Sequence, residues 1–337
     1  MVSESPQVVV RKRERGYAAE EFKLDAALVR VPKSSEYITR YRQNAWDVFQ
    51  SMAMPNVKDE AWRRTDIKNI KASGLSLATA DGNKMAVKPP ENLLKPLTGE
   101  KNVAQIVMTA DSVEVSADEK LLSRGVIFTD LRTAEQKYPE KLEKVLGKVV
   151  RAEEGKFAAM AAALAQEGVF LYVPKNVQVE LPFHSLLWGT GSKKLYISHI
   201  LVYLEEGASA TYMHEAASPT ETEQSVHVGN VEIFVGRGAS LKFVELQSWG
   251  EHIWNFSHER VVVEGDGKVD WVFGAIGSGL TKNFSDLNLI GQGAEGRISG
   301  FYFTDHQQHL DHDTQQNHLA PHTTSDLIFK GALLGAS

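Results

Sequence analysis

The spacing of apolar residues changes once along the chain, near residue 168. Before that point, apolar residues recur at three- and four-residue steps in two stretches, which is the period of a helix with one buried face. The first predicted helix begins at Ser34 or Ser35, either of which can cap it, and runs to about Met52. The second covers about Gly155–Glu167 and closes at Gly168.

Short apolar runs lie between these helices. Val103–Met108, Val113–Val115 and Gly125–Phe128 predict three short strands. A further helix begins either at a capping box formed by Thr133 and Gln136 or at Pro139, and ends before Gly147. Residues 73–98 are small and polar and predict a loop. We therefore expect a polar, loosely ordered tail over 1–33 and a mixed α/β region over 34–168.

From Val169 onwards, short β-rich runs alternate with glycine-containing turns. Four turns have a similar sequence, and their glycines follow one another after 31, 29 and 26 residues (Gly207, Gly238, Gly267, Gly293). A unit of this length cannot bury its own apolar face, whereas stacked units share one core. The repeat predicts a parallel β-helix over 169–337. A double-sheet barrel of the cupin kind is the alternative. The drift of the repeat length from 31 to 26 residues weakens the β-helix prediction, whereas the repeated Gly-Ala/Gly-Lys turn motif favours the β-helix over the barrel.

Composition narrows the functional classes. The formal net charge of -6 gives no electrostatic reason for nucleic-acid binding. The apolar run Phe157–Ala165 is too short to span a bilayer, and the first residues do not have the pattern of a signal peptide. The chain has no cysteine, so disulfides, thiolate metal ligands and a cysteine nucleophile are excluded. We expect a cytoplasmic protein that binds neither nucleic acid nor membrane.

Five of the eleven histidines lie within Asp305–Lys330, interleaved with four aspartates (His306, His309, His312, His318, His322; Asp305, Asp311, Asp313, Asp326). Imidazole and carboxylate are common ligands of divalent metals, so His309, His312 and His318 are the candidate metal ligands. In a strand, however, His309 and His312 point to opposite faces. The cluster is therefore either a metal site completed by a neighbouring rung or the polar edge of one more rung.

The other sequence motifs give weaker indications of function. No phosphate-binding glycine loop or nucleophile elbow occurs in a suitable context, and the acidic residues are scattered. Trp62 lies among charged residues and is the candidate partner contact; the alternative is an indole folded over a Lys or Arg stem. No catalytic residue is predicted.

Three segments in order resemble the SufB/SufD family of iron–sulfur cluster assembly proteins, and the SufD branch in particular. They are KDEAWRRTDI at Lys58–Ile67, the pair Gly155–Ala159 and Gly168–Pro174, and HLDHDTQQNHLAPHTTSDLIFKGAL at His309–Leu333. The resemblance spans about Pro55 to Lys330. The absence of cysteine and the Trp-Arg element favour SufD over SufB.

The resemblance implies a right-handed parallel β-helix and a non-catalytic scaffold that acts with SufB and the ATPase SufC. It implies no firmly bound cofactor, only transient iron or a nascent iron–sulfur cluster held by the complex. In the family, a Cys-Ser-His-Gly segment and C-terminal helices follow the rungs, and neither occurs before Ser337. We therefore expect a truncated member, from which no residue inherits the role of that histidine. A stand-alone metal-dependent enzyme using the cluster at 305–326 is the alternative.

Overall fold

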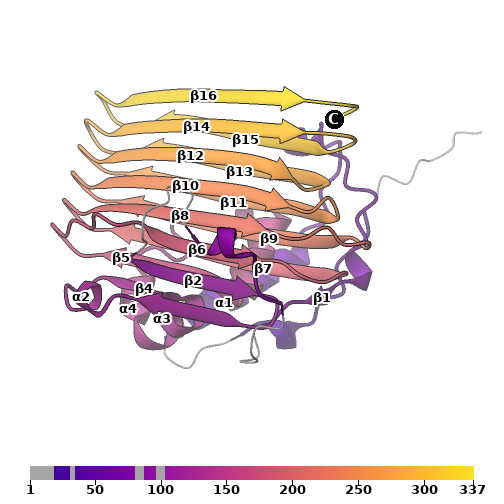
Figure 1. The fold of residues 1–337 in the computed structure, drawn as a ribbon, viewed down its shortest axis with the longest axis horizontal. Helices are drawn as coiled ribbons and strands as arrows, with labels where there is room; N and C mark the ends of the chain where they lie inside the picture. The colour runs from indigo at the N-terminus through magenta and orange to yellow at the C-terminus, as the bar shows by residue number, and fades with distance from the viewer. Residues whose placement is uncertain (1–18, 31–34, 80–86, 96–102) are drawn as a thin grey trace, which may run out of the picture.

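The computed structural model of the chain describes residues 19–30, 35–79, 87–95 and 103–337. Most of the tail expected over 1–33 lies outside these ranges. Two stacked sheets form the body of the molecule, and helices cover one side of it (Figure 1).

Local sequence accounts for the helices of the N-terminal region. The longest, α1, spans Glu36–Ser51, and the Ser35 hydroxyl accepts a hydrogen bond from the Ile38 amide, as the capping prediction requires. Helix α5 spans Lys156–Leu164 and is buried along its whole length. The shorter helices are α2 (Glu119–Leu122), α3 (Leu131–Lys137) and α4 (Pro139–Leu142). Single 3-10 turns are η1 (Ala26–Leu28), η2 (Glu60–Trp62), η3 (Ala72–Gly74), η4 (Glu91–Leu94) and η5 (Ala152–Glu154).

The strands of the N-terminal region are β1 (Ser76–Leu77), β2 (Ala104–Thr109), β3 (Val113–Ala117) and β4 (Ile127–Asp130). The coils that follow contain β5 (Glu167–Val173), β6 (Phe183–Trp188), β7 (Lys194–Leu204), β8 (Ser209–Ala217), β9 (Ser225–Val235), β10 (Ser240–Trp249), β11 (Ile253–Val263), β12 (Lys268–Gly277), β13 (Leu280–Leu289), β14 (Glu295–Thr304), β15 (His309–His318) and β16 (Thr324–Leu333).

Successive coils alternate between two sheets. Sheet A runs in the order β15-β13-β11-β9-β7-β5-β4, with β1 beside β7, and sheet B runs β16-β14-β12-β10-β8-β6-β2-β3. Equivalent strands of successive coils pair in parallel, for example Glu259 with Val231 on one side and Ser285 on the other. The two antiparallel pairs, β2 with β3 and β4 with β5, lie at the N-terminal end of the stack. The predicted parallel β-helix is confirmed, and the cupin-like barrel is wrong because that barrel is built from antiparallel strands.

Each coil turns from sheet A to sheet B through one residue in the left-handed region. These residues have φ between 57° and 74° at equivalent places (Asn176, Gly207, Gly238, Asp266, Gly293, His322). The third turn is therefore aligned on Asp266, one residue before the glycine chosen from the sequence. Glycine is favoured at such positions because it has no Cβ, and Asn and Asp tolerate them better than other residues.

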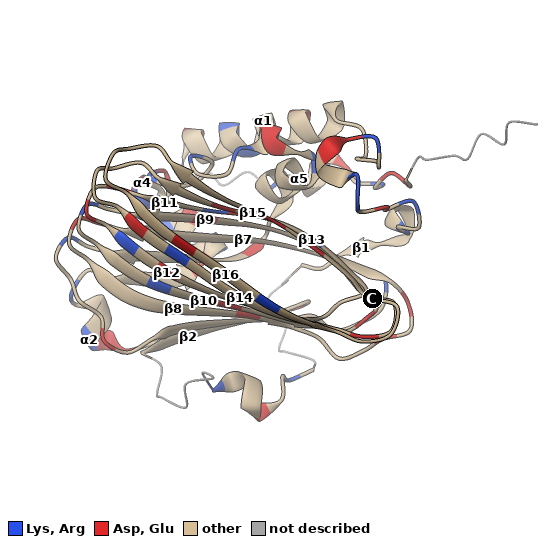
Figure 2. Cartoon of the chain, turned by 90° about the horizontal axis from the view of Figure 1, so that it is seen from above, with Lys and Arg blue, Asp and Glu red and all other residues tan. Residues whose placement is uncertain are grey.

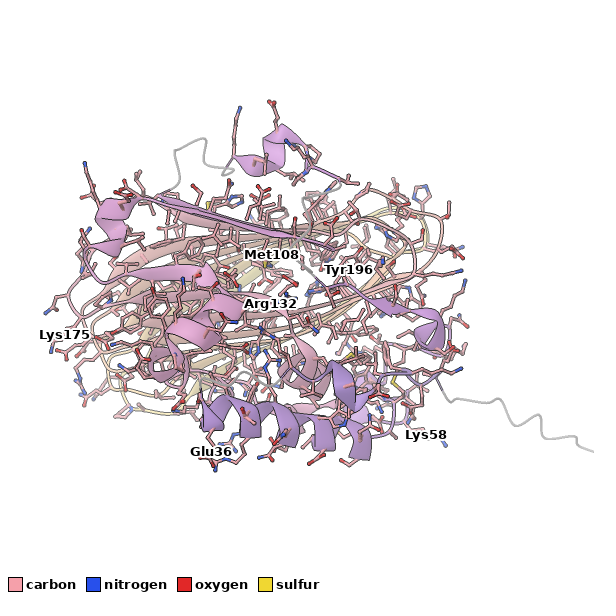
Figure 3. The ribbon with its side chains drawn as sticks, turned by 90° about the horizontal axis from the view of Figure 1, so that it is seen from below. Glu36, Lys58, Met108, Arg132, Lys175 and Tyr196 are labelled. Atoms are coloured by element: carbon pink, nitrogen blue, oxygen red, sulfur yellow. The ribbon has the colours of Figure 1, made fainter. Side chains whose placement is uncertain are left out.

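Two apolar cores lie on either side of sheet A. The first is enclosed between the sheets and includes Met108 and Tyr196, which lie in the middle of the molecule in Figure 3. The second lies between the outer face of sheet A and the layer formed by α1, α5 and the 3-10 turns η1, η2, η3 and η5, which covers that face in Figure 2. A small third cluster forms where Leu93 and Leu94 of η4 pack on the outer face of sheet B.

Two boundaries differ from the sequence-based expectation, and the alternative helix start at Pro139 is confirmed. Helix α3 begins at Leu131 because the Asp130 carboxylate caps the Thr133 amide, so Thr133 lies inside the helix. Helix α5 ends at Leu164, and Glu167 already belongs to β5, where parallel pairing with β7 overrides its helix propensity. Helix α4 begins at Pro139 and is separate from α3.

Candidate functional site

The histidine-rich segment forms β15, the last strand of sheet A. Parallel pairing with β13 aligns His309 with Leu280 and His312 with Asn283. Alternation along the strand turns His309 and Asp311 towards the N-terminal layer and His312 towards the space between the sheets. The prediction that this stretch is a rung of the β-helix is confirmed.

The outward side of β15 is held by hydrogen bonds. The Thr65 hydroxyl lies 2.5 Å from Asp311 Oδ2 and 3.2 Å from His309 Nε2, and Lys282 Nζ lies 3.0 Å from the same carboxylate oxygen. Burial alone would raise the pKa of Asp311, but the hydrogen bonds from Thr65 and Lys282 outweigh it and lower that pKa. This carboxylate is therefore ionised, and it joins the segment after η2 to the last rungs.

His312 is the inward histidine. Its ring meets Phe273 edge-on at 4.8 Å, and its Nε2 atom is buried without a hydrogen-bond partner among the described residues. Burial lowers the pKa of His312 to about 4, so the imidazole is neutral at physiological pH. An open hollow of about 450 Å³ lies over it, lined in part by Arg64, Tyr302 and Phe329. A neutral imidazole with an unpartnered nitrogen beside such a hollow can bind a borderline metal ion.

The other histidines of the segment lie elsewhere. His318 is at the far end of β15, where its two ring nitrogens bond to the Thr323 and Ser325 hydroxyls at 2.6 and 2.9 Å. His306 and His322 occupy left-handed turn positions with φ of 53° and 58°. Thus His309 and His312 lie on opposite faces of β15, and His318 lies six residues further along the strand, at the turn. Among the residues that the structure describes, no group of three or more His, Asp or Glu side chains is arranged to hold a metal ion.

Trp62 lies under the N-terminal layer rather than on its surface. Its side chain is 8 % exposed, and its ring centroid lies 5.5 Å from that of Phe157, 5.8 Å from Phe256 and 6.1 Å from Phe284. Phe157 and Phe256 stack in parallel at 4.1 Å. The indole thus connects the segment around η2 to α5 and to the outer face of sheet A. Contact of Trp62 with a partner stays a prediction.

Sequence reasoning did not identify the polar residues inside the β-helix. At the inward positions, Ser185, Ser198, His214, His227 and Asn255 are buried between the sheets and hydrogen-bonded to one another or to their neighbours. His227, for example, bonds to Ser198 at 2.9 Å and to Asn255 at 2.6 Å. The sequence does contain a signal for these residues, because polar residues recur at the same inward position of successive units. This recurrence becomes visible only after the units have been aligned by their turns.

A second unidentified element is Glu232 on the outer face of sheet A. Its carboxylate is fully buried and accepts hydrogen bonds from the amides of Gly147, Val149 and Val150 at 2.8, 2.8 and 3.0 Å. His199 Nε2 lies 2.8 Å from the same group. One side chain thus holds the chain segment between α4 and α5 against the sheet.

The fold and this site define a two-sheet β-solenoid with an α/β N-terminal region packed on one face. Two family models match consecutive parts of the chain: the SufBD protein N-terminal region over residues 19–184, and the SufBD core domain of the SUF system for FeS cluster assembly over residues 187–337. The chain belongs to the SufBD family of iron–sulfur cluster assembly proteins.

Curated relatives agree with this assignment. An iron-sulfur cluster assembly SufBD family protein of Staphylococcus aureus is 32% identical over 213 residues, which are 63% of this chain and 46% of the relative. A protein of the same description from Staphylococcus haemolyticus is 31% identical over 213 residues, with the same coverage of both chains. The chain thus spans about half the length of the curated relatives it matches. No helix of the described residues has the length and apolar character needed to cross a membrane.

Proposed function

We propose that this chain is a SufD-like scaffold subunit of the SUF iron–sulfur cluster assembly complex, without catalytic activity of its own. The observation that carries the proposal is the ordered match of both SufBD regions over a parallel β-helix. The chain acts with a SufB-like subunit and a SufC-like ATPase, in the cytoplasm. The right-handed sense of the coil and the SufD rather than SufB assignment belong to this proposal.

The proposed SufB-like partner pairs with the C-terminal end of the β-helix. In the described chain β15 and β16 are the last strands of their sheets, and each pairs with a neighbour on one side. Leu327 and Leu333, which face inward along β16, are 45 % and 63 % exposed. An unpaired strand edge beside exposed apolar side chains is a template for further strands, whether these come from the same gene product or from a partner.

The test is association under reducing, anaerobic conditions. The full-length gene product is co-expressed with the SufB-like and SufC-like proteins of the same organism and purified through a tag on the SufB-like subunit. We expect a complex that contains all three chains. If the product associates with neither of the others, the scaffold proposal is wrong.

His312 is the residue of this chain that we propose as a contact for transient iron in the complex. The supporting observation is its neutral ring with a buried, unpartnered Nε2 beside the open hollow. The purified complex with His312→Ala should retain less iron than the wild type. His318→Ala is the matched control because His318 already bonds to two hydroxyls. Equal loss in both variants, or in neither, would contradict the assignment.

A further inference from the structure

The interior of the β-helix contains two carboxyl groups that face each other across the sheets. Glu245 extends inward from β10 of sheet B, and Glu259 extends inward from β11 of sheet A. They are 9 % and 2 % exposed. Neither is needed for the partner contacts proposed above, and buried carboxyl groups are costly unless they are paired or neutralised.

The two carboxyl groups are unequally satisfied. Glu259 accepts hydrogen bonds from Asn283 Nδ2 at 2.6 Å and from the Ser285 hydroxyl at 3.3 Å. Glu245 Oε2 is buried without a hydrogen-bond partner of ordinary geometry among the described residues, although the Trp271 indole and the Glu259 carboxyl interact with the Glu245 carboxyl and affect its pKa. The same two side chains line a cavity in which the centre of a water-sized molecule can occupy a volume of about 20 Å³. That is space for about one such guest.

The charge around this cavity is not balanced by the protein. His214 and His227 also line it, but burial lowers their pKa values to about 3 and about 4, so both rings are neutral. No Lys or Arg is among the described residues that line the cavity. Once one of the two carboxyl groups loses its proton, a negative charge remains inside the β-helix. Its counter-charge has to be a second proton or a small cation.

We infer that this cavity is a binding site for one small monovalent cation of about the size of K⁺ or ammonium, held between Glu245, Glu259 and the Ser257 hydroxyl. The cavity admits one ion without a hydration shell, and the donors are hard oxygen atoms, which suit such ions. Among the described residues, no group of three or more His, Asp or Glu side chains is placed to hold a metal ion here. This inference does not depend on the proposed role in cluster assembly.

The cation competes with protons. Burial, followed by the negative charge of Glu259, raises the pKa of Glu245 well above its ordinary value, and burial also raises the pKa of Glu259. A raised folded-state pKa means that stability is greatest at low pH and is lost as the pH rises above the ordinary carboxyl range. The cation replaces the lost proton, so its stabilising effect grows as the pH rises.

The experiment measures the thermal midpoint of the full chain at one ionic strength in potassium, ammonium or choline chloride. At about pH 8.5 we expect Tm to be higher by about 3 °C or more in potassium or ammonium than in choline, and the difference to shrink at about pH 5. Equal midpoints in the three salts at the higher pH would overturn the inference. A cation effect of the same size at both pH values would also overturn it.

Variants locate the site. Glu245→Gln should abolish the difference between potassium and choline, whereas Glu206→Gln, at an exposed turn, should leave it intact. Ser257→Ala retains both carboxyl groups and should weaken the cation effect even if Glu245→Gln does not fold. Crystals grown with rubidium should show anomalous density in the cavity. Density for a water molecule alone would refute the cation assignment.

Discussion

Replacing Glu232 with Gln tests how the N-terminal layer is attached to the β-helix. One carboxylate oxygen of Glu232 accepts from the Val149 and Val150 amides, and the other accepts from the Gly147 amide and lies 2.8 Å from His199 Nε2. Glutamine has nearly the same shape but replaces one of these acceptors with a donor. Two buried N–H groups therefore lose their acceptor in Glu232→Gln.

The expected cost follows from those two groups. A buried donor without a partner costs about 1–3 kcal/mol, and partial relaxation of residues 147–150 gives a total of about 2–4 kcal/mol. For a chain of this length, that corresponds to a fall in Tm of about 3–6 °C. Urea denaturation measures the free energy, and hydrogen exchange measures the protection of the three amides. Glu206→Gln is the matched control and should change stability by less than about 0.5 kcal/mol.

The reasoning would be refuted by either of two results. If Glu232→Gln unfolds within about 0.5 kcal/mol of the wild type, the buried carboxylate does not hold the layer. If the stability falls but the amides of Gly147, Val149 and Val150 exchange as slowly as before, the loss arises elsewhere in the molecule. The predicted result combines lower stability with faster exchange at these three amides.

The remaining predictions concern the aromatic contact, the interior and the turns. Trp62→Ala should lower the free energy of unfolding by about 3–5 kcal/mol because it leaves a cavity among stacked rings, whereas Arg63→Ala, at an exposed side chain, should be almost neutral in the same urea assay. Burial lowers the pKa of His214 to about 3, so the free energy of unfolding should fall as the pH drops below about 6.5. His214→Asn should make this dependence of stability on pH less steep. An unchanged pH dependence in the variant would contradict the assignment to His214. Gly207→Ala should cost about 1–2 kcal/mol because φ is 65°, while Asp266→Gly should change stability by less than about 1 kcal/mol, both measured by denaturation.

The parts of the fold that depend on local sequence were predictable. The period of apolar residues and the Ser35 cap gave α1 almost to the residue. The turn glycines gave the repeat, since each coil needs one residue with positive φ. The exact alignment was missed at Asp266 because aspartate tolerates that conformation and a glycine follows it directly. Where a helix competes with a sheet, as at Glu167, pairing with a distant strand decides the outcome, and no local pattern shows it.

The candidate site was less predictable because its geometry depends on register between coils. The density of histidines in 305–326 indicated a common site, but two of the five serve as left-handed turn residues and His318 bonds to its own turn. Of these five histidines, only His312 has a buried ring nitrogen without a hydrogen-bond partner among the described residues. The interior carboxyl pair could not be predicted from the sequence for the same reason. Glu245 and Glu259 come close to each other only because sheet A and sheet B pack face to face.

The two sheets also differ in how their outer faces meet the rest of the molecule, and this difference bears on domain organisation. On sheet B, one row across neighbouring strands alternates in charge and consists of Lys242, Asp270, Arg297 and Asp326. The outer face of sheet A is aromatic, and Trp62 and α5 complete its core.

The sheets themselves continue into the N-terminal region. Strand β2 pairs with β6, and β4 pairs with β5, so both sheets contain strands from before and after residue 168. A fragment that begins at Val169 would expose the aromatic face of sheet A and remove strands from one end of each sheet. The boundary at 168 and 169 therefore marks a change in sequence pattern, while the buried cores on both sides of sheet A require residues from both halves to fold together.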